Sequence, residues 1–346
     1  MNATTCRRIL LHPLMLLSLA GALLHPGQAQ AQLCSATANP ISFPSVDVVT
    51  GNNYATTGSY TITCNIGLLG VGSANISACL NIAGASGVTP RTMTNGINNL
   101  SYNLYADSAH TTIWGTYGGS PALPNPPNPV NLTVSSLLLG GSTTSSPVTI
   151  YGYLQSSQNT TVGAGPPSLY SASPTATLTF NYSYSFLFGP GTPTPCTSGP
   201  SGSNGSSSVA LAVNATVIND CIVTATPINF GGSVGVLSSA LSATGTITAK
   251  CTNSDSYTIA LNKGTTTGAS LSDRQMAGSG TAVVHYQLYT NSGHSTIWGD
   301  GTSGTSTSGG TGTGSNQNYT VYGLVSPQTT PAPNLYSDTV TVTVSY

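Results

Sequence analysis

Charged side chains are scarce in this chain of 346 residues. It has six Lys and Arg together, seven Asp and no Glu, so that charged residues make up 4% of the sequence and the net charge at pH 7 is −1. An ordinary soluble domain has about 25% charged residues. A nucleic-acid backbone is bound by basic residues that neutralise its phosphates, and this composition therefore predicts no nucleic-acid partner. The shortage of charged residues also excludes helices stabilised by ion pairs and charged disordered tails.

Groups for catalysis and metal binding are also scarce. The Asp residues are scattered, whereas general acid–base chemistry usually needs paired carboxylates or a positioned His. No Cys-x-x-Cys pair occurs, and His110, His285 and His294 are the only imidazoles after residue 31. His110 and His294 occupy equivalent positions of a repeat, which favours a role in the shared fold. We predict no enzymatic activity, no cofactor and no metal site.

The first 31 residues have the order of a secretory signal peptide. Arg7 and Arg8 precede an apolar run at 9–24, and Ala29-Gln30-Ala31 offers small residues for cleavage. The run is shorter than the roughly 20 residues of a membrane-spanning helix. Cleavage would remove Cys6, one of seven cysteines, and leave an even number, which in an exported chain predicts disulfides. We therefore expect a signal peptide at 1–31 and secretion.

The remainder of the chain consists of two copies of one domain. Cys34 and Cys64 are separated by the same number of positions as Cys221 and Cys251. Further blocks match in the same order: 38–43 with 225–230, 102–105 with 286–289, 110–115 with 294–299, 151–152 with 322–323, and 169–171 with 335–337. Such order establishes a duplication. We predict an N-terminal domain at 32–195, a Gly/Ser-rich linker at 196–208 and a C-terminal domain at 209–346.

The repeat also favours one pairing of the cysteines. Four cysteines in the first copy and its linker allow three pairings, and the equivalent positions in the second copy favour one of them. Each closed loop of roughly 30 residues would contribute about 3 to 4 kcal/mol. The expected pairs are Cys34 with Cys64, Cys221 with Cys251, and Cys79 with Cys196.

Alternation of apolar and polar residues predicts strands throughout. It covers 176–188 and 340–346, and no long segment of helical period follows the signal peptide. Short alternating runs separated by Gly, Pro, Asn and Ser predict an all-β fold of two immunoglobulin-like antiparallel β-sandwich domains. The alternating segment 209–217 is compatible with two positions: it is either the first strand of the second domain or a strand that partly closes the first.

The end of the sequence predicts an open edge in the second domain. The sequence stops at Tyr346, inside the strand that aligns with 177–182, so we expect the C-terminal domain to lack a final strand. An uncovered groove and edge would then need a partner chain. The predicted edge of this acceptor groove consists of Val340, Val342, Val344 and Tyr346.

The repeated blocks resemble the spore coat protein U domain family, whose members include subunits of archaic, Csu-type chaperone–usher pili. The resemblance rests on the two Cys-to-Cys segments, the Tyr-x-Leu-Tyr and Ile-Trp-Gly blocks, and the ending 336–346. In that family the tip subunit has two domains and no free donor strand. The resemblance implies a tip adhesin that reaches the cell surface through the periplasm. Its implied partners are a periplasmic pilus chaperone, an outer-membrane usher, the donor strand of the next subunit, and an abiotic or host surface.

Apolar residues framed by glycine or proline distinguish the first copy from the second, where the equivalent segments are shorter or polar. Exposed apolar loops in a secreted protein suggest contact surfaces. Burial of one Leu side chain against such a surface stabilises the contact by about 1.5 to 3 kcal/mol. The alternative is that 137–139 is a buried strand and 68–71 a packed turn. The predicted surface-binding residues are Leu68, Leu69, Val71, Ala122, Leu123, Leu137, Leu138 and Leu139.

Two other functions are compatible with the sequence. The chain could be a secreted structural coat or matrix protein with two self-complete U-type domains. It could also be a lectin-like module that uses Tyr, Asn and Thr side chains of the first domain.

Overall fold

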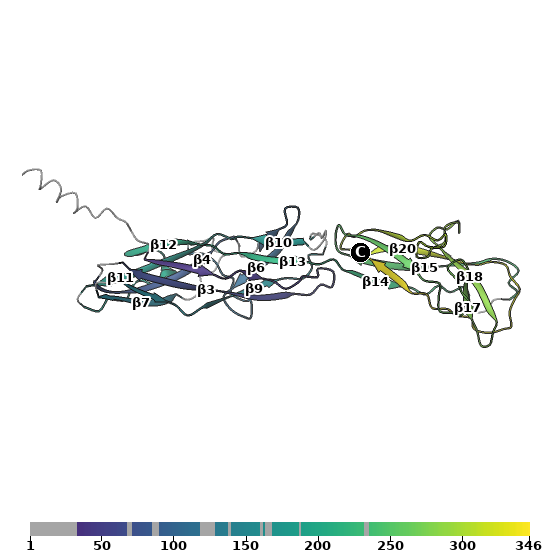
Figure 1. The fold of residues 1–346 in the computed structure, drawn as a ribbon, viewed down its shortest axis with the longest axis horizontal. Helices are drawn as coiled ribbons and strands as arrows, with labels where there is room; N and C mark the ends of the chain where they lie inside the picture. Colours follow the sequence, from purple (N-terminus) through teal and green to yellow (C-terminus); the bar gives the residue numbers. More distant parts are fainter. Residues whose placement is uncertain are drawn as a thin grey trace, which may run out of the picture.

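The computed structural model describes residues 33–67, 71–84, 90–117, 129–137, 140–159, 162, 168–186, 188–231 and 235–346. The predicted signal peptide at 1–31 lies outside this part of the chain. Within it, the structure is built from strands and one short 3-10 helix, and no helix is long and apolar enough to span a membrane. Two antiparallel β-sandwiches lie one after the other along the long axis of the molecule (Figure 1). The expected all-β fold is confirmed.

The first sandwich contains two sheets that face each other across one apolar core. One sheet has the order β1-β3-β9-β6-β5-β10-β13-β2, with β8 also paired to β3, and the other has the order β12-β11-β4-β7. Its elements are β1 (Cys34–Ala38), β2 (Ile41–Ser42), β3 (Tyr54–Ile66), β4 (Val71–Ile82), β5 (Arg91–Thr94), β6 (Asn99–Tyr105), β7 (Val130–Leu137), β8 (Gly141–Thr144), β9 (Val148–Leu154), β10 (Ser168–Ala172), β11 (Ala176–Ser185), the 3-10 helix η1 (Cys196–Ser198), β12 (Ser203–Val209) and β13 (Val213–Val217).

The second sandwich repeats this plan with fewer strands. Its sheets have the orders β14-β15-β20-β18-β17 and β19-β16-β21. The strands are β14 (Cys221–Ala225), β15 (Leu241–Cys251), β16 (Ser256–Leu261), β17 (Arg274–Ala277), β18 (Val283–Tyr289), β19 (Ser308–Thr311), β20 (Gln317–Val325) and β21 (Val342–Ser345). The duplication is visible in the cores, where the Trp114 indole N–H donates to the Leu80 carbonyl at 2.8 Å and that of Trp298 to the Ile259 carbonyl at 3.0 Å.

The three predicted disulfides are formed. Cys34 on β1 is bonded to Cys64 on β3, and Cys221 on β14 is bonded to Cys251 on β15. The third bond joins Cys79 on β4 to Cys196 in η1. It fixes the segment after β11 to the first sandwich.

The segment 196–217 belongs to the first sandwich, and this corrects the predicted domain boundaries. Cys196 is buried, β12 pairs with β11 over its whole length, and β13 pairs with β10. The apolar face that the sequence left unassigned is packed into the first core: Val209, Leu211, Val213, Ala215 and Val217. A Gly/Ser-rich segment can form a strand when a neighbour supplies its hydrogen bonds, so composition misidentified 196–208 as a linker. Only residues 218–220 connect β13 to β14.

Candidate functional site

β13 closes the first sandwich by adding to a sheet whose other strands come from much earlier in the chain. It runs antiparallel to β10 and parallel to β2. The Ile41 N–H donates to the Ala212 carbonyl at 2.8 Å, and the Phe43 N–H donates to the Asn214 carbonyl at 2.9 Å. These bonds satisfy the backbone of β2, and both side chains are buried. The first sandwich thus supplies its own closing strand.

The same position is open in the second sandwich. Ile228 and Phe230 match Ile41 and Phe43, but both side chains are only half-buried. Among the described residues, no strand pairs with 228–230, and the N–H groups of Ile228 and Phe230 have no backbone partner. The opposite side of the opening is formed by Tyr336, which is half-buried where its counterpart Tyr170 is fully buried. An apolar groove therefore lies where β13 lies in the first sandwich.

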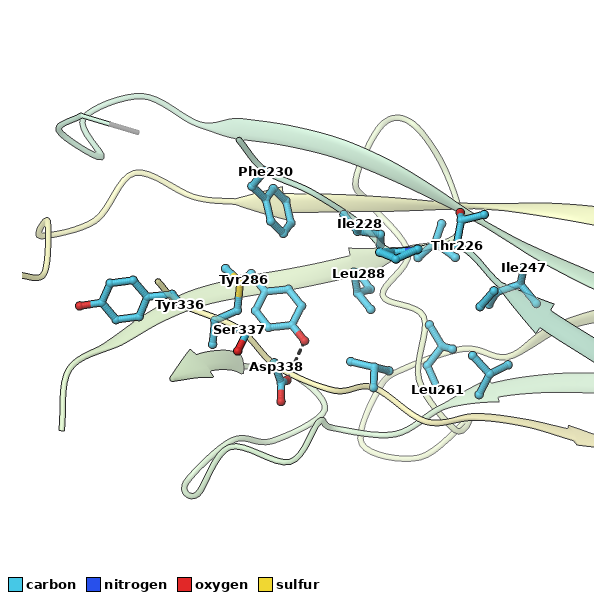
Figure 2. A pocket seen from close by; sticks show the side chains of 16 residues that line it. Thr226, Ile228, Phe230, Ile247, Leu261, Tyr286, Leu288, Tyr336, Ser337 and Asp338 are labelled. Atoms are coloured by element: carbon cyan, nitrogen blue, oxygen red, sulfur yellow. Dashed lines mark hydrogen bonds between the residues drawn. The ribbon is translucent and has the colours of Figure 1, made fainter. Parts of the chain in front are cut away.

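Figure 2 shows the side chains that line this groove. It has a volume of about 280 Å³ and collects apolar residues from both sheets. Ile228 and Phe230 lie along one side, and Tyr286 and Leu288 of β18 lie between them and residues 336–338 (Figure 2). Further apolar lining comes from Ile247, Leu261, Met276, Val321, Val340 and Val342.

One polar cluster interrupts the apolar lining. The Tyr286 hydroxyl donates to Asp338 Oδ2 at 2.8 Å, and Asp338 Oδ1 accepts hydrogen bonds from the backbone N–H groups of Thr265 and Thr339, both at 2.9 Å. Burial and the contact with Asp338 raise the pKa of Tyr286 well above its usual value. The carboxylate is therefore occupied in joining three segments beside the groove.

Two of the four residues of the predicted acceptor edge line the groove. Val340 and Val342 line the groove, whereas Val344 packs against the core further along β21 and Tyr346 is about half exposed. β21 pairs with β16 on one side and is the last strand of its sheet. Its counterpart β11 pairs with β4 on the equivalent side and with β12 on the side that β21 leaves open. Sequence reasoning missed Ile228 and Phe230, although the repeat already aligned them with Ile41 and Phe43.

Most of the predicted surface-binding residues lie outside the described part of the chain: Leu68, Leu69, Ala122, Leu123, Leu138 and Leu139. Val71 and Leu137 are described in their backbones alone, where they pair with each other at the ends of β4 and β7. The neighbouring ends of β3 and β8 also pair, through Ile66 and Gly141. The loops that follow these pairs therefore start from one end of the first sandwich.

An exposed aromatic segment lies at this same end. Ser185, the last residue of β11, pairs with Ser73 near the start of β4. Beside and beyond it are Tyr184, Phe186 and Phe188, which are 48%, 59% and 83% exposed and which we call the aromatic arm. The alternation over 176–188 predicted a half-buried strand, and this is wrong for Phe186 and Phe188, because the strand pairing of β11 ends at Ser185. The end with β7, β11 and β12 points away from the second sandwich (Figure 1).

The repeated histidines serve corresponding structures in the two copies. His110 and His294 both have positive φ, 57° and 50°. Their rings meet Tyr105 and Tyr289 edge to face, with centroids 5.3 Å and 5.2 Å apart. In the described ranges, no group of three or more His, Cys or Asp residues is arranged to hold a metal ion.

Comparisons with known proteins give the following similarities. The family model named Spore Coat Protein U domain matches residues 22–166 and 207–343. No curated protein matches the chain. A chain of the CsuC–CsuE chaperone–tip adhesion subunit pre-assembly complex of Acinetobacter baumannii is 19% identical, with a TM-score of 0.46 over 90% of this chain and 100% of that one. The CupB6 tip adhesin from Pseudomonas aeruginosa is 12% identical, with a TM-score of 0.37 over 91% and 93%.

Proposed function

Because the chain belongs to the Spore Coat Protein U domain family, we propose that it is the tip adhesin of an extracellular chaperone–usher pilus. Its second sandwich accepts a donor strand from the next subunit. The observation that carries this proposal is the difference between two equivalent positions: β13 fills one, and the described residues leave the other as an apolar groove. Completion of a sandwich by another chain's extended strand is a known mode of recognition.

The first sandwich supports a position at the end of a polymer. Its closing strand is part of its own chain, so the position that is open in the second sandwich is already filled in the first. The second sandwich can bind one strand and thereby attach the chain to a pilus. A chain with one open groove and one closed sandwich ends the polymer at the closed side.

The first sandwich also indicates what the incoming strand should look like. β13 and the residues before it place an apolar side chain at every second position, and all of them are at most 6% exposed. Each large apolar residue buried in this way stabilises the complex by about 1.5 to 3 kcal/mol. The donor strand should therefore alternate apolar and polar residues and accept the N–H groups of Ile228 and Phe230. Before assembly, a periplasmic chaperone would cover the same groove and an outer-membrane usher would exchange it for the donor.

We further propose that the far end of the first sandwich makes the surface contact. The aromatic arm is exposed there, and the apolar loops at 68–71 and 137–139 start from the same end. Large exposed apolar groups gathered at one place are typical of interaction surfaces. The bound surface would be an abiotic or host surface with apolar character.

Hydrogen exchange on the purified chain tests the acceptor groove. Without a partner, the amides of Ile228 and Phe230 should exchange at least tenfold faster than those of Ile41 and Phe43, because only the latter donate to a neighbouring strand. Adding the chaperone or a donor peptide should slow the exchange of Ile228 and Phe230 and leave that of Ile41 and Phe43 unchanged. Equal protection in both sandwiches without any partner would instead favour the self-complete coat or matrix protein.

A further inference from the structure

A second cavity lies on the outer face of the first sandwich. Along β9, Ile150, Gly152 and Leu154 are buried in the core, whereas Tyr151 and Tyr153 point to the other face and are partly exposed. The cavity forms beside Tyr153, between β6 and the segment 155–158, and has a volume of about 250 Å³. One buried water needs only about 10 to 15 Å³. The space is therefore large enough for a ring-sized ligand.

The lining combines aromatic rings with neutral polar groups. The rings of Tyr105 and Tyr153 are 6.3 Å apart, and the His110 ring stacks at 4.5 Å from Tyr153 with a tilt of 30°. Hydroxyl and carboxamide groups complete the lining, including Ser101 and Gln155, and none of the described lining residues carries a charge. Such a site suits a neutral ligand that has an apolar face for the rings and several hydroxyls for the polar groups.

The segment that covers the cavity is anchored. The Gln158 carboxamide accepts the Ser101 N–H at 2.6 Å and donates to the Ser101 carbonyl at 2.9 Å. In the second sandwich, the Gln328 carboxamide likewise accepts the His285 N–H at 3.0 Å and donates to the His285 carbonyl at 2.8 Å. The anchor thus belongs to the shared fold. It holds the polar groups of 155–158 in place before a ligand arrives, which lowers the ordering cost of binding.

Other features of the cavity are particular to the first copy. Tyr153 occupies the position of Leu324 in the second sandwich, as the flanking Tyr-Gly pairs show. Ser157, in the covering segment, has a positive φ of 68°. A non-glycine residue held in this region costs about 1 to 3 kcal/mol, and such strain is concentrated at functional sites. The aromatic wall and the strained rim are therefore additions to the shared fold.

We propose that this cavity binds one unit of a neutral saccharide. The C–H face of the sugar ring packs against Tyr153 and Tyr105, and its hydroxyls exchange hydrogen bonds with Ser101, Gln155 and the hydroxyls at 156–157. The site goes beyond attachment through the apolar end, and it is independent of the groove. A chain that fails to accept a donor strand would still bind the sugar.

Titration of the purified full chain with free sugars tests this site. Saturation-transfer NMR with glucose, galactose, mannose and N-acetylglucosamine should show saturable binding of at least one of them. N-acetylneuraminic acid serves as the anionic comparator and should bind at least tenfold more weakly. Y153L, which installs the residue of the second sandwich, should weaken binding at least tenfold. Y151L alters a tyrosine on the same strand and face that does not line the cavity, and should change binding less than twofold.

A second variant tests the site independently, in case Y153L does not fold normally. Gln155 is exposed in the covering segment, so Q155A should fold normally and weaken binding about threefold or more. The proposal is overturned if no neutral sugar binds saturably. It is also overturned if Y153L and Q155A both bind as tightly as the unaltered chain, or if the anionic sugar binds equally well.

Discussion

Ile41 and Ile228 occupy equivalent positions of the two sandwiches, but only Ile41 is covered by a strand. Its side chain is fully buried and its N–H donates to the Ala212 carbonyl at 2.8 Å. Ile228 lines an open groove, and its N–H has no backbone partner among the described residues. One sequence motif therefore produces a finished core in the first copy and a binding site in the second. The difference arises from β13, which lies in the first sandwich alone.

The closing strand should be essential for the stability of the first sandwich. Val213 is fully buried between β10 and β2. V213A should lower the free energy of unfolding of the first sandwich by about 1.5 to 3 kcal/mol. The control N214A alters a side chain on the opposite face of the same strand and should change it by less than about 0.5 kcal/mol. Chemical denaturation measures both, and equal effects would argue against β13 as a core strand.

The aromatic arm should carry a measurable part of surface attachment. The double variant F186S/F188S removes two exposed rings without entering the core. On cells that assemble the pilus, it should reduce attachment to polystyrene several-fold, because apolar contact area is lost. The control I97S removes an even more exposed apolar residue from the turn between β5 and β6. If both variants attach alike at equal piliation, the arm is not the contact surface.

Each core contains a buried arginine, and the amide side chain beside it is one methylene group shorter in the first sandwich than in the second. In the second sandwich, Arg274 Nη1 donates to Gln287 Oε1. In the first, Asn103 stands in place of Gln287, and both Arg91 Nη1 and Asn103 Oδ1 are buried without a hydrogen-bond partner among the described residues. An unsatisfied buried group costs about 1 to 3 kcal/mol. N103Q should therefore raise the free energy of unfolding of the first sandwich by about 1 kcal/mol or more.

The reciprocal change provides the control. Q287N shortens the side chain that Arg274 uses and should destabilise the second sandwich by about 1 to 3 kcal/mol. Thermal denaturation followed by calorimetry separates the two transitions. A destabilising effect of N103Q would show that Arg91 and Asn103 are not an equivalent pair.

Stability at the joint between the sandwiches should depend on pH through Asp255. The Asn219 side-chain N–H donates to Asp255 Oδ1 at 3.0 Å, while Asp255 Oδ2 and Asn219 Oδ1 are buried and have no partner in the part of the chain that the structure describes. Burial raises the pKa of Asp255. A raised carboxyl pKa contributes stability below its unfolded value near 3.9, and this contribution is lost as pH rises through the folded pKa.

The variant D255N should remove this loss. Its carboxamide can donate to Asn219 Oδ1 at every pH, as protonated Asp255 would. We expect D255N to be more stable than the unaltered chain at pH 7 and nearly equal to it at pH 3. Urea denaturation at a series of pH values measures the difference, and a gain independent of pH would refute the assignment to Asp255.

The sequence by itself determined the duplication, the three disulfides and the all-β fold. These are local or repeated properties: a cysteine spacing recurs, and alternation of apolar residues specifies a strand wherever it lies. The sequence also placed Val340 and Val342 at an expected edge, and both line the groove.

The tertiary structure alone decided which sheet each apolar face enters. Alternation over 209–217 indicates a buried strand but does not specify which strands it pairs with. In the structure β13 pairs with β2, more than 170 positions earlier in the chain. The alternation at 184–188 is the same in kind, yet Phe186 and Phe188 are exposed because the strand pairing of β11 ends at Ser185. Burial depends on what covers a residue, and that is set by pairings between distant segments.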